Sequence, residues 1–425
     1  MLYELPNRQT IHHLNQYETD FVYHEIFENN VYFQHGIELP SNAIVLDLGA
    51  NIGLFSLLIR NNYPSATIYA FEPSPQTFPL LKANFRQDND THLFQCAIGQ
   101  STNSLSLVDY PGYSVISGTN TNQQRDSEII LAGCKPTAEE YQATKKLVQY
   151  RLSNKKSYTS NATTISTIIK QQQLQKIDLV KIDIEGAELV AIKGIAINDW
   201  NKLKQLVIEV HSQALLDKII PLLTKQGFML TIAKDQQLKQ ATIFNLYARR
   251  PSVTQAMKNH FAQREALHRH LVQSNLLVMN GYLNTSHQVL AQRAQAHDLS
   301  KRSPLESRAY TYLDWRFYCQ AQQLSINYPT AIEQAINQGW QQHLHNNRHH
   351  PEFHLDCNQM SMLDLIEMVC DWTAISQELQ QGNGSCKNWA KENIDKKWKF
   401  NERTKQLIFT IIDELDKRLR ETTYA

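Results

Sequence analysis

The sequence predicts two domains: an α/β domain with a mostly parallel, seven-stranded sheet over residues 1–250, and an all-α domain over residues 251–425. Between Ile44 and Arg249, short β-branched apolar runs alternate with helical patterns, as in a sheet that helices cover on both faces. After Pro251 the pattern is helical, with few strand signals. A chain of 425 residues is also longer than one ordinary hydrophobic core requires, which favours two domains.

The elements of the first domain follow in order along the chain. The predicted strands, with a closing hairpin as the last two, are Ala43–Gly49, Thr67–Pro73, His92–Gly99, Ile177–Gly186, Gln205–His211, Phe228–Lys234 and Ala241–Arg250. The predicted helices are Ile52–Asn62, Gln76–Arg86, a segment that follows Gly186 and runs through Gly194, and Gln213–Gln226. The polar stretch Ser101–Thr163 interrupts this alternation. Because so long a stretch inside a domain is usually functional, we expect a substrate cap there, partly helical between Thr137 and Leu152.

Composition limits the classes of function. Apolar residues make up 42% and charged residues 20%, and a net charge of +1 gives no support to nucleic-acid binding. The six cysteines form no CxxC pair, the N-terminus lacks a signal-peptide pattern, and no run approaches the roughly 18 apolar residues of a membrane span. We therefore expect a cytoplasmic protein without nucleic-acid or membrane contact, and a homo-oligomer stays open.

The segment VLDLGANIGLFS, Val45–Ser56, predicts a nucleoside site where a strand turns into a helix. Gly49 permits the sharp turn, and Gly53 lets the helix approach the sheet or a ligand closely. Asp47 would repel a pyrophosphate but attract an amino group, and Glu72, at the end of the next strand, would accept hydrogen bonds from ribose hydroxyls. This set indicates S-adenosylmethionine (SAM) and not NAD, whose fingerprint has a third glycine. The alternative is a packing turn without a ligand.

These residues resemble the FkbM family of SAM-dependent methyltransferases. The similarity rests on VLDLGANIGLFS, FEPSPQTFPLLKANF, CAIG, NATTIST and LVKIDIEGAELVAIKGI, in that order, and covers roughly residues 32–249. It implies a Rossmann-like fold and methylation of a hydroxyl of a metabolite, sugar or peptide, although the long Ser101–Thr163 segment departs from the family pattern. The resemblance places Asp47, Gly49 and Asn51 at the methionine end of SAM, Glu72 at the ribose, Pro73 and Ser74 around it, and Ala97 and Ile98 beside the adenine.

Three side chains are the candidates for acceptor chemistry. Asp183 and Glu185 follow the fourth strand, next to the expected sulfonium, and either would serve as base or substrate anchor. Alternatively, Glu185 caps the helix that follows Gly186. His211, at the end of the fifth strand, is a second base candidate, or else a buried hydrogen-bonded histidine.

The second domain contains histidines and aspartates in an order typical of a metal site. They are His268, the pair His297–Asp298, His343, His349, His350 and Asp371, each group expected on its own helix or helix end. Imidazole and carboxylate ligands from several helices suit iron or manganese, with zinc as a further option. More than four protein ligands exceed what one tetrahedral zinc needs and indicate a two-metal site bridged by Asp298. The alternatives are a solvated histidine loop, and His287 in place of His268.

This arrangement resembles the HD superfamily of metal-dependent phosphohydrolases, including its six-ligand phosphodiesterases and di-iron oxygenases. A closer similarity, over Phe261–Leu415, is to a little-characterised bacterial and phage family with HDxSK, NNRHHPE and DLIEMVCDW. The match implies the ligand set above, with His349 or His350 as the fifth ligand. Lys301 would meet a substrate anion, and Glu352 would orient a ligand histidine. Phosphoester hydrolysis is the leading expectation; oxidation and a non-catalytic, metal-stabilised scaffold are its rivals.

Overall fold

The computed structural model describes residues 1–110, 113–119, 123–134, 137, 139–234 and 243–423. It divides into two compact units, and each is described by itself. The first unit contains Met1–Pro251 and Cys319–Thr330, and the second contains Ser252–Tyr318 and Ala331–Ala425. In the described part of the chain, no helix combines the length and the apolar content that crossing a bilayer requires.

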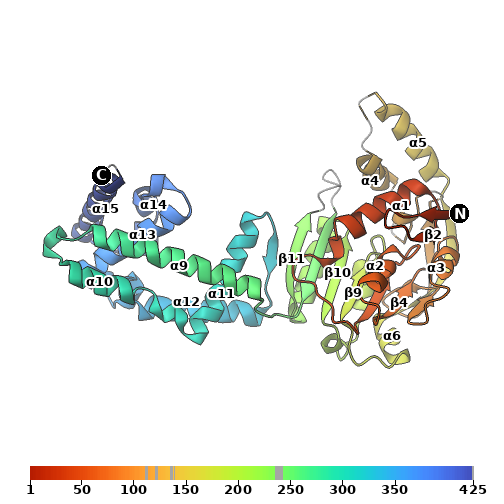
Figure 1. Cartoon of the computed structure of the whole chain (residues 1–425), viewed down its shortest axis with the longest axis horizontal. Coiled ribbons are helices and arrows are strands. Elements are labelled where there is room, and N and C mark those ends of the chain that lie inside the picture. Colours follow the sequence, from red (N-terminus) through yellow and green to blue (C-terminus); the bar gives the residue numbers. More distant parts are fainter. Residues whose placement is uncertain (111–112, 120–122, 135–136, 138, 235–242, 424–425) are drawn as a thin grey trace. The chain divides into compact units, whose positions relative to one another are not determined.

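The first unit is built on a mixed sheet (Figure 1). Its strands, in chain order, are β3 Ile44–Leu48, β4 Thr67–Phe71, β5 Thr91–Phe94, β9 Leu179–Ile182, β10 Gln205–Val210, β11 Met229–Lys234, β12 Phe244–Arg249 and β13 Ser325–Asn327. In space the order is β13-β11-β12-β10-β9-β3-β4-β5, and the strands from β10 to β5 are parallel. The predicted closing hairpin is present, with β12 inserted antiparallel between β11 and β10.

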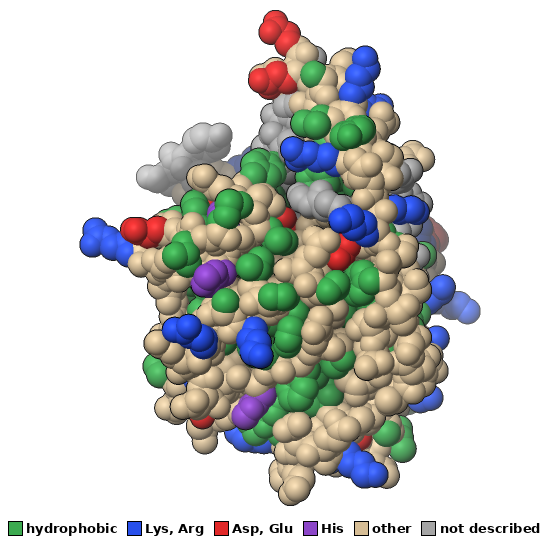
Figure 2. Space-filling view, turned by 90° about the vertical axis from the view of Figure 1, so that its right-hand side faces the viewer, with side chains coloured by type: hydrophobic (Ala, Val, Ile, Leu, Met, Phe, Trp, Pro, Cys, Tyr) green, Lys and Arg blue, Asp and Glu red, His purple; other side chains and the backbone are tan. Residues whose placement is uncertain are grey.

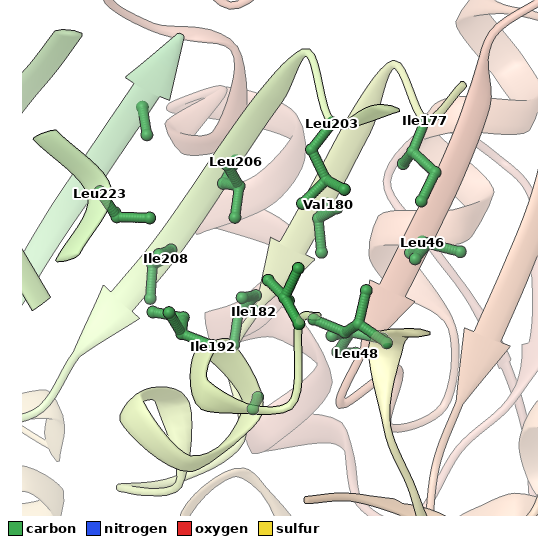
Figure 3. Close-up of a cluster of buried hydrophobic side chains, with 14 of the residues drawn as sticks. Leu46, Leu48, Ile177, Val180, Ile182, Ile192, Leu203, Leu206, Ile208 and Leu223 are labelled. Carbon is green, nitrogen blue, oxygen red and sulfur yellow. The ribbon is translucent and has the colours of Figure 1, made fainter. Parts of the chain in front are cut away.

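Helices cover both faces of this sheet, as the alternation of elements predicts. They are α1 Gln16–Tyr23, α2 Leu54–Asn62, α3 Phe78–Asn84, α6 Ile165–Gln171, α7 Glu188–Lys193 and α8 Gln213–Lys225. Leu46 and Leu48 of β3 pack in the core under α6–α8, which Figure 3 shows in part, whereas Val45 faces the core under α1–α3. Because both faces are buried, β3 needs a continuous apolar run instead of an alternating one.

Two sequence-based expectations for this unit are wrong. His92–Gly99 does not form one strand: β5 ends at Phe94, and β6 Ala97–Ile98 pairs instead with β8 Lys156–Thr163. The apolar run continues through the break because the apolar residues on both sides of it are half-buried or buried. The all-helical expectation after Pro251 also fails at β13, a three-residue strand that joins the edge of β11. So short a strand has no period to detect, since pairing with β11 alone defines it.

The stretch Ser101–Thr163 is an ordered insertion over its described residues. β7 Ser104–Asp109 pairs antiparallel with β8, and between them lie α4 Gln123–Cys134 and α5 Tyr141–Ser153. The expected helical part agrees with α5, but the β7–β8 hairpin and α4 were not anticipated. A projection at the top of Figure 2 carries both acidic and basic side chains. Over the whole face that Figure 2 shows, lysines and arginines are scattered among other residues.

The second unit is helical, as the sequence predicts. Its helices are α9 Gln255–Val278, α10 His287–Ala296, α11 Pro304–Ala321, α12 Thr330–Asn346, α13 Met362–Glu378, α14 Lys387–Lys397 and α15 Glu402–Thr423. Every residue from Asp364 to Ala374 is buried, so α13 is the central helix of the unit and not an amphipathic surface helix. It packs against α9 and α15, and its polar side chains therefore need partners inside the unit.

Candidate functional site

A pocket lies at the carboxyl ends of β3, β4, β9 and β10, where a parallel sheet ordinarily binds ligands. Most of the predicted cofactor-site and catalytic residues line it. They are Gly49, Asn51, Glu72, Pro73, Ala97, Ile98, Asp183, Glu185 and His211. The insertion contributes Ser114, Ile116, Ser117 and Gly118 to the same lining. The predicted cap segment therefore helps to enclose the pocket.

The turn after β3 requires glycine at position 49. Gly49 has a φ of 81°, and a Cβ there would lie 1.9 Å from the carbonyl oxygen of Asp183. The Gly49 and Ala50 amides both donate to the Phe71 carbonyl oxygen, at 3.0 and 2.9 Å. The absence of a side chain thus lets the ends of three strands converge and leaves room for a ligand beside the backbone.

Glu72 is held in place by the backbone around it. Its carboxylate accepts hydrogen bonds from the Asn51 amide at 2.8 Å and the Ser74 amide at 2.9 Å. Burial raises the pKa of this carboxyl group above its ordinary value. Because an ionised carboxylate has about four acceptor positions, two remain for hydroxyl donors such as those of a ribose. Its role toward a ribose stays a prediction.

Asp47 and Gly53 lie outside the described residues that line the pocket. Asp47 is fully buried, accepts from the Ser56 hydroxyl at 2.7 Å and faces the Lys181 ammonium at 3.4 Å. A Cβ on Gly53 would lie 2.5 Å from the ring of Phe85, so this glycine permits close packing of α2 on α3. Contact of these two residues with a cofactor stays a prediction.

Lys181 also lines the pocket, and its place there was not predicted from the sequence. Its ammonium donates to the Gly49 carbonyl oxygen at 2.7 Å and lies between Asp47 and Asp183, at 3.4 and 3.3 Å. Burial would lower its pKa, but the charges of Asp183 and Asp47 outweigh burial and raise it. The lysine therefore fixes the glycine turn and one candidate catalytic carboxylate together. A lysine within an apolar strand before two acidic residues was the available signal.

Replacing Lys181 by Met is expected to destabilise the first unit by about 3–5 kcal/mol, because two carboxylates lose a buried counter-charge. Lys176→Met is the matched control: Lys176 pairs with Asp178 at 3.0 Å but is 41% exposed, so its loss should cost only about 0–1 kcal/mol. Urea unfolding followed by near-ultraviolet circular dichroism measures both. Equal shifts in the two variants would contradict the buried counter-charge role.

Asp183, Glu185 and His211 come together at the tips of β9 and β10, with ligand atoms within 4.8 Å of one another. The His211 Nε2 atom lies 3.2 Å from both Glu185 and Glu209, and its Nδ1 atom lies 3.1 Å from Glu188. The alternative capping role of Glu185 finds no support, because α7 begins after the N-cap Ala187 and has no side-chain cap. The Gly186 amide donates to Glu188 at 2.7 Å.

The electrostatics of this cluster favour retained protons. Burial raises the pKa of Glu185 well above its ordinary value, although the charge of His211 opposes the rise. Burial would lower the pKa of His211, but the charges of Glu185 and Glu188 raise it well above its ordinary value. The two shifts have different main causes: burial raises the pKa of Glu185, whereas neighbouring carboxylates raise the pKa of His211 against the effect of burial. A base at this position accepts a proton only after losing its own, at a higher pH than an ordinary carboxylate requires.

The second unit brings the predicted metal ligands together from α9, the end of α10, α12, the turn after α12, and α13. One group contains His268, His297 and Asp371, and the other contains Asp298, His343, His349 and His350. His297 and His349, one from each group, also form a third set with Glu367. Within each group the ligand atoms lie within 4.8 Å of one another. His287, the alternative to His268, is exposed at the start of α10 and belongs to neither group. Glu352 accepts from the Trp398 indole at 2.8 Å, so this contact does not support its expected orienting role.

Several atoms in these groups have no hydrogen-bond partner although they are buried. They are Asp298 Oδ1, His349 Nε2 and His350 Nε2. In the other group, the Nε2 atoms of His268 and His297 lie 3.4 Å apart. Burial would lower the pKa of His297, but the Asp298 charge, with Asp371 and Glu367, raises it to about 10. Metal ligands are expected to include buried nitrogen and oxygen atoms without hydrogen-bond partners. They are also expected to lie where neighbouring carboxylates favour a positive charge.

Comparisons with known proteins match two separate segments of the chain. Residues 47–230 match the methyltransferase FkbM domain, and residues 257–414 match a family of unknown function, DUF5662. The chain is 32% identical over 252 residues to 31-O-demethyl-FK506 methyltransferase FkbM of Streptomyces tacrolimicus, covering 58% of this chain and 95% of that protein. It is 30% identical over 240 residues to methyltransferase sdnD of Sordaria araneosa, covering 53% and 88%.

A solved structure of Aeropyrum pernix fibrillarin with natively bound S-adenosyl-L-methionine is 10% identical, and the match covers 58% of this chain and 92% of that one. Its TM-score of 0.30 is too low to support a structural argument.

Proposed function

The chain belongs to the FkbM family and is a SAM-dependent methyltransferase, and we propose that it methylates a hydroxyl oxygen of a metabolite, sugar or peptide. The observation that carries this proposal is the cluster of Asp183, Glu185 and His211 in the pocket that Glu72 and Gly49 also line. A hydroxyl must lose its proton as it attacks, so an acceptor of this kind needs a base at the end of the pocket where these residues lie. SAM, when bound, supplies a methyl group on a positively charged sulfur.

The residues divide the work between binding and proton transfer. Glu72 accepts the ribose hydroxyls, and Ala97 and Ile98 provide an apolar wall for the adenine. Asp183 lies beside the Lys181 ammonium and the Tyr32 hydroxyl, which is 3.3 Å away, and it anchors the acceptor. Glu185 takes the acceptor proton, and His211 Nε2 lies 3.2 Å from its carboxylate as an ion-pair partner. The insertion residues Ser114–Gly118 close over this end of the pocket and exclude water.

Cofactor binding is tested with S-adenosylhomocysteine, which should raise the melting temperature of the full chain, whereas saturating NAD should not. Glu72→Gln should weaken S-adenosylhomocysteine about 10- to 100-fold in calorimetric titration, because hydrogen bonds to a charged acceptor are lost. The exposed Glu38→Gln is the control and should bind like the unaltered chain. Stabilisation by NAD, or unaltered binding in Glu72→Gln, would contradict the assigned site.

The rate should fall on the acid side at a higher pH than an ordinary carboxylate would give. As pH decreases through the raised pKa of Glu185, this carboxylate gains a proton and no longer accepts one from the acceptor. The measurement is kcat/KM against pH, with an acceptor isolated from a metabolite extract by transfer of a tritiated methyl group. An acid limb at about pH 4, typical of a solvated glutamate, would contradict the buried base.

For the helical unit we propose a metal-dependent enzyme of the HD type, with phosphoester hydrolysis as its activity. The converging Asp298, His349 and His350 atoms without hydrogen-bond partners support a metal site. Bound divalent ions would polarise a phosphoryl oxygen and lower the pKa of a bound water. Lys301, whose ammonium lies 2.7 Å from Asp298 Oδ2, is placed to meet the substrate anion.

Metal content after purification without added metal separates this proposal from its rivals. Manganese or zinc with release of phosphate from a model phosphodiester supports hydrolysis. Iron together with a requirement for oxygen would favour the oxygenase. If chelation lowers the melting temperature of the unit while neither activity is found in the metal-loaded chain, the scaffold alternative gains support.

A further inference from the structure

Asp298 lies between the two groups of predicted metal ligands, and each of its carboxylate oxygens faces one group. Oδ1 is 3.4 Å from His343 Nε2 and 3.6 Å from His349 Nε2. Oδ2 is 3.7 Å from both His268 Nε2 and His297 Nε2. A carboxylate with this placement is suited to bridge two cations. The backbone at Asp298 is left-handed, with a φ of 55°, which directs the side chain inward immediately after His297.

Buried glutamate side chains contact the Nδ1 atoms of the histidines, whereas the Nε2 atoms face the other predicted metal ligands. Glu306 Oε2 is 3.0 Å from His343 Nδ1, and Glu378 contacts His268 Nδ1. Glu367 Oε1 is 3.0 Å from His297 Nδ1 and 3.4 Å from His349 Nδ1. An ionised carboxylate only accepts hydrogen bonds, so each Nδ1 carries a hydrogen, and Nε2 is the ring nitrogen that remains to bind a metal ion. All four imidazoles are thereby turned the same way.

The glutamates are not equivalent, because each serves a different set of rings. Glu306 contacts only the group with His343, and Glu378 contacts only the group with His268, among the described ligand histidines. Glu367 serves one histidine from each group. It is also fixed from the other side by Arg293, whose guanidinium donates to Glu367 Oε2 at 2.8 Å. Glu367 and Asp298 therefore connect the two groups twice, once on each side of His297 and His349.

We propose that Glu378 and Glu306 separately position the two centres of the predicted two-metal site, and that Glu367 couples these centres. The first centre takes His268, His297, Asp371 and one oxygen of Asp298. The second takes His343, His349, His350 and the other oxygen. Because two groups share Asp298 and Glu367, an ion in one centre orders ligands of the other, and binding of the two ions is cooperative. This inference rests on the proposed metal-dependent function of the unit.

The test measures Mn²⁺ bound to the full chain after chelation and dialysis, by elemental analysis across a range of free Mn²⁺ and by native mass spectrometry. The unaltered chain should bind about two ions. Glu306→Gln and Glu378→Gln should each weaken one ion about 10- to 100-fold, and Glu367→Gln should weaken both and reduce their cooperativity. Glu392→Gln, at an exposed position of α14, is the control and should leave both ions unchanged.

Combination with a ligand substitution identifies the centre that each glutamate serves. Glu306→Gln should add nothing to His343→Ala, since the same ion is already lost, but should weaken the remaining ion of His268→Ala. Glu378→Gln should give the reverse pattern. Arg293→Met removes the ion pair of Glu367 but leaves its carboxylate facing the rings, so it should weaken Mn²⁺ less than Glu367→Gln. Equal losses in those two variants would indicate a merely structural role for Glu367.

The outcomes separate this inference from the function on which it rests. Two ions in the unaltered chain with the stated pattern of losses would support both. Two ions that bind equally well in all three Gln variants, or one ion per chain, would overturn the coupled centres while a metal-dependent activity stands. A chain that takes up no Mn²⁺, Fe²⁺ or Zn²⁺ would overturn the metal function and this inference together.

Discussion

Replacing Glu185 by Gln is expected to lower kcat for methyl transfer by about 10²- to 10⁴-fold, the range that positioned proton transfer contributes. Gln has nearly the same shape but does not accept the acceptor's proton as a carboxylate does. The side chain faces His211 and lies apart from Glu72 at the ribose end, so affinity for S-adenosylhomocysteine should change by less than about two-fold. The assay follows transfer of a tritiated methyl group to the isolated acceptor.

The same experiment distinguishes a base from an anchor. If Glu185 only holds the acceptor, Gln should raise KM and leave kcat close to that of the unaltered chain. Asp183→Asn gives the matched comparison, because Asp183 is the proposed anchor and should show that KM effect. Glu38→Gln, on the exposed surface, should change neither parameter. Full kcat in Glu185→Gln would show that Glu185 is not the base. The pH dependence of the rate would then have to arise from His211.

Local patterns explain why so much of the first unit was predictable. Gly49, Glu72, Asp183 and His211 each follow a strand that an apolar run announces, and parallel strands bring their ends to one edge. The partners of Lys181 were not predictable in this way. Asp47 and Gly49 approach its ammonium from another chain segment, that of β3, and no sequence period records that meeting. The strand β6 was missed for the same reason, since only its pairing with β8 separates it from β5.

The helical unit shows the same limit at the level of side-chain roles. A concentration of histidines is easily noticed in a sequence. The histidines and aspartates that were predicted to come together do so in the structure. Glu306, Glu367 and Glu378 were missed because glutamate on a helix is ordinarily a solvated surface residue. Burial of α13 on all sides is what places Glu367 against the imidazoles. Glu352, chosen because it adjoins the histidines in sequence, contacts Trp398 instead.

Replacing Asp298 by Ala is expected to remove both metal ions, the largest effect of any single substitution in the helical unit. Each centre would lose one carboxylate oxygen, and the coupling between them would be broken. The loss in Mn²⁺ affinity should exceed the about 10- to 100-fold expected for a residue that only orients a ligand. Elemental analysis after dialysis against a defined free Mn²⁺ concentration measures this directly, with His345→Ala, an exposed histidine of α12, as the control.

Asp298→Asn refines the test, because an amide offers one oxygen where the carboxylate offers two. It should keep at most one of the two ions, since the amide nitrogen facing the other centre is a donor and does not bind a cation. Lys301→Met controls for loss of the ion pair at 2.7 Å, and near-ultraviolet circular dichroism checks that each variant is folded. Two tightly bound ions in a folded Asp298→Ala chain would mean that the centres do not share this residue. In that case one centre would contain His268 and the other would contain His343, with no residue shared between them.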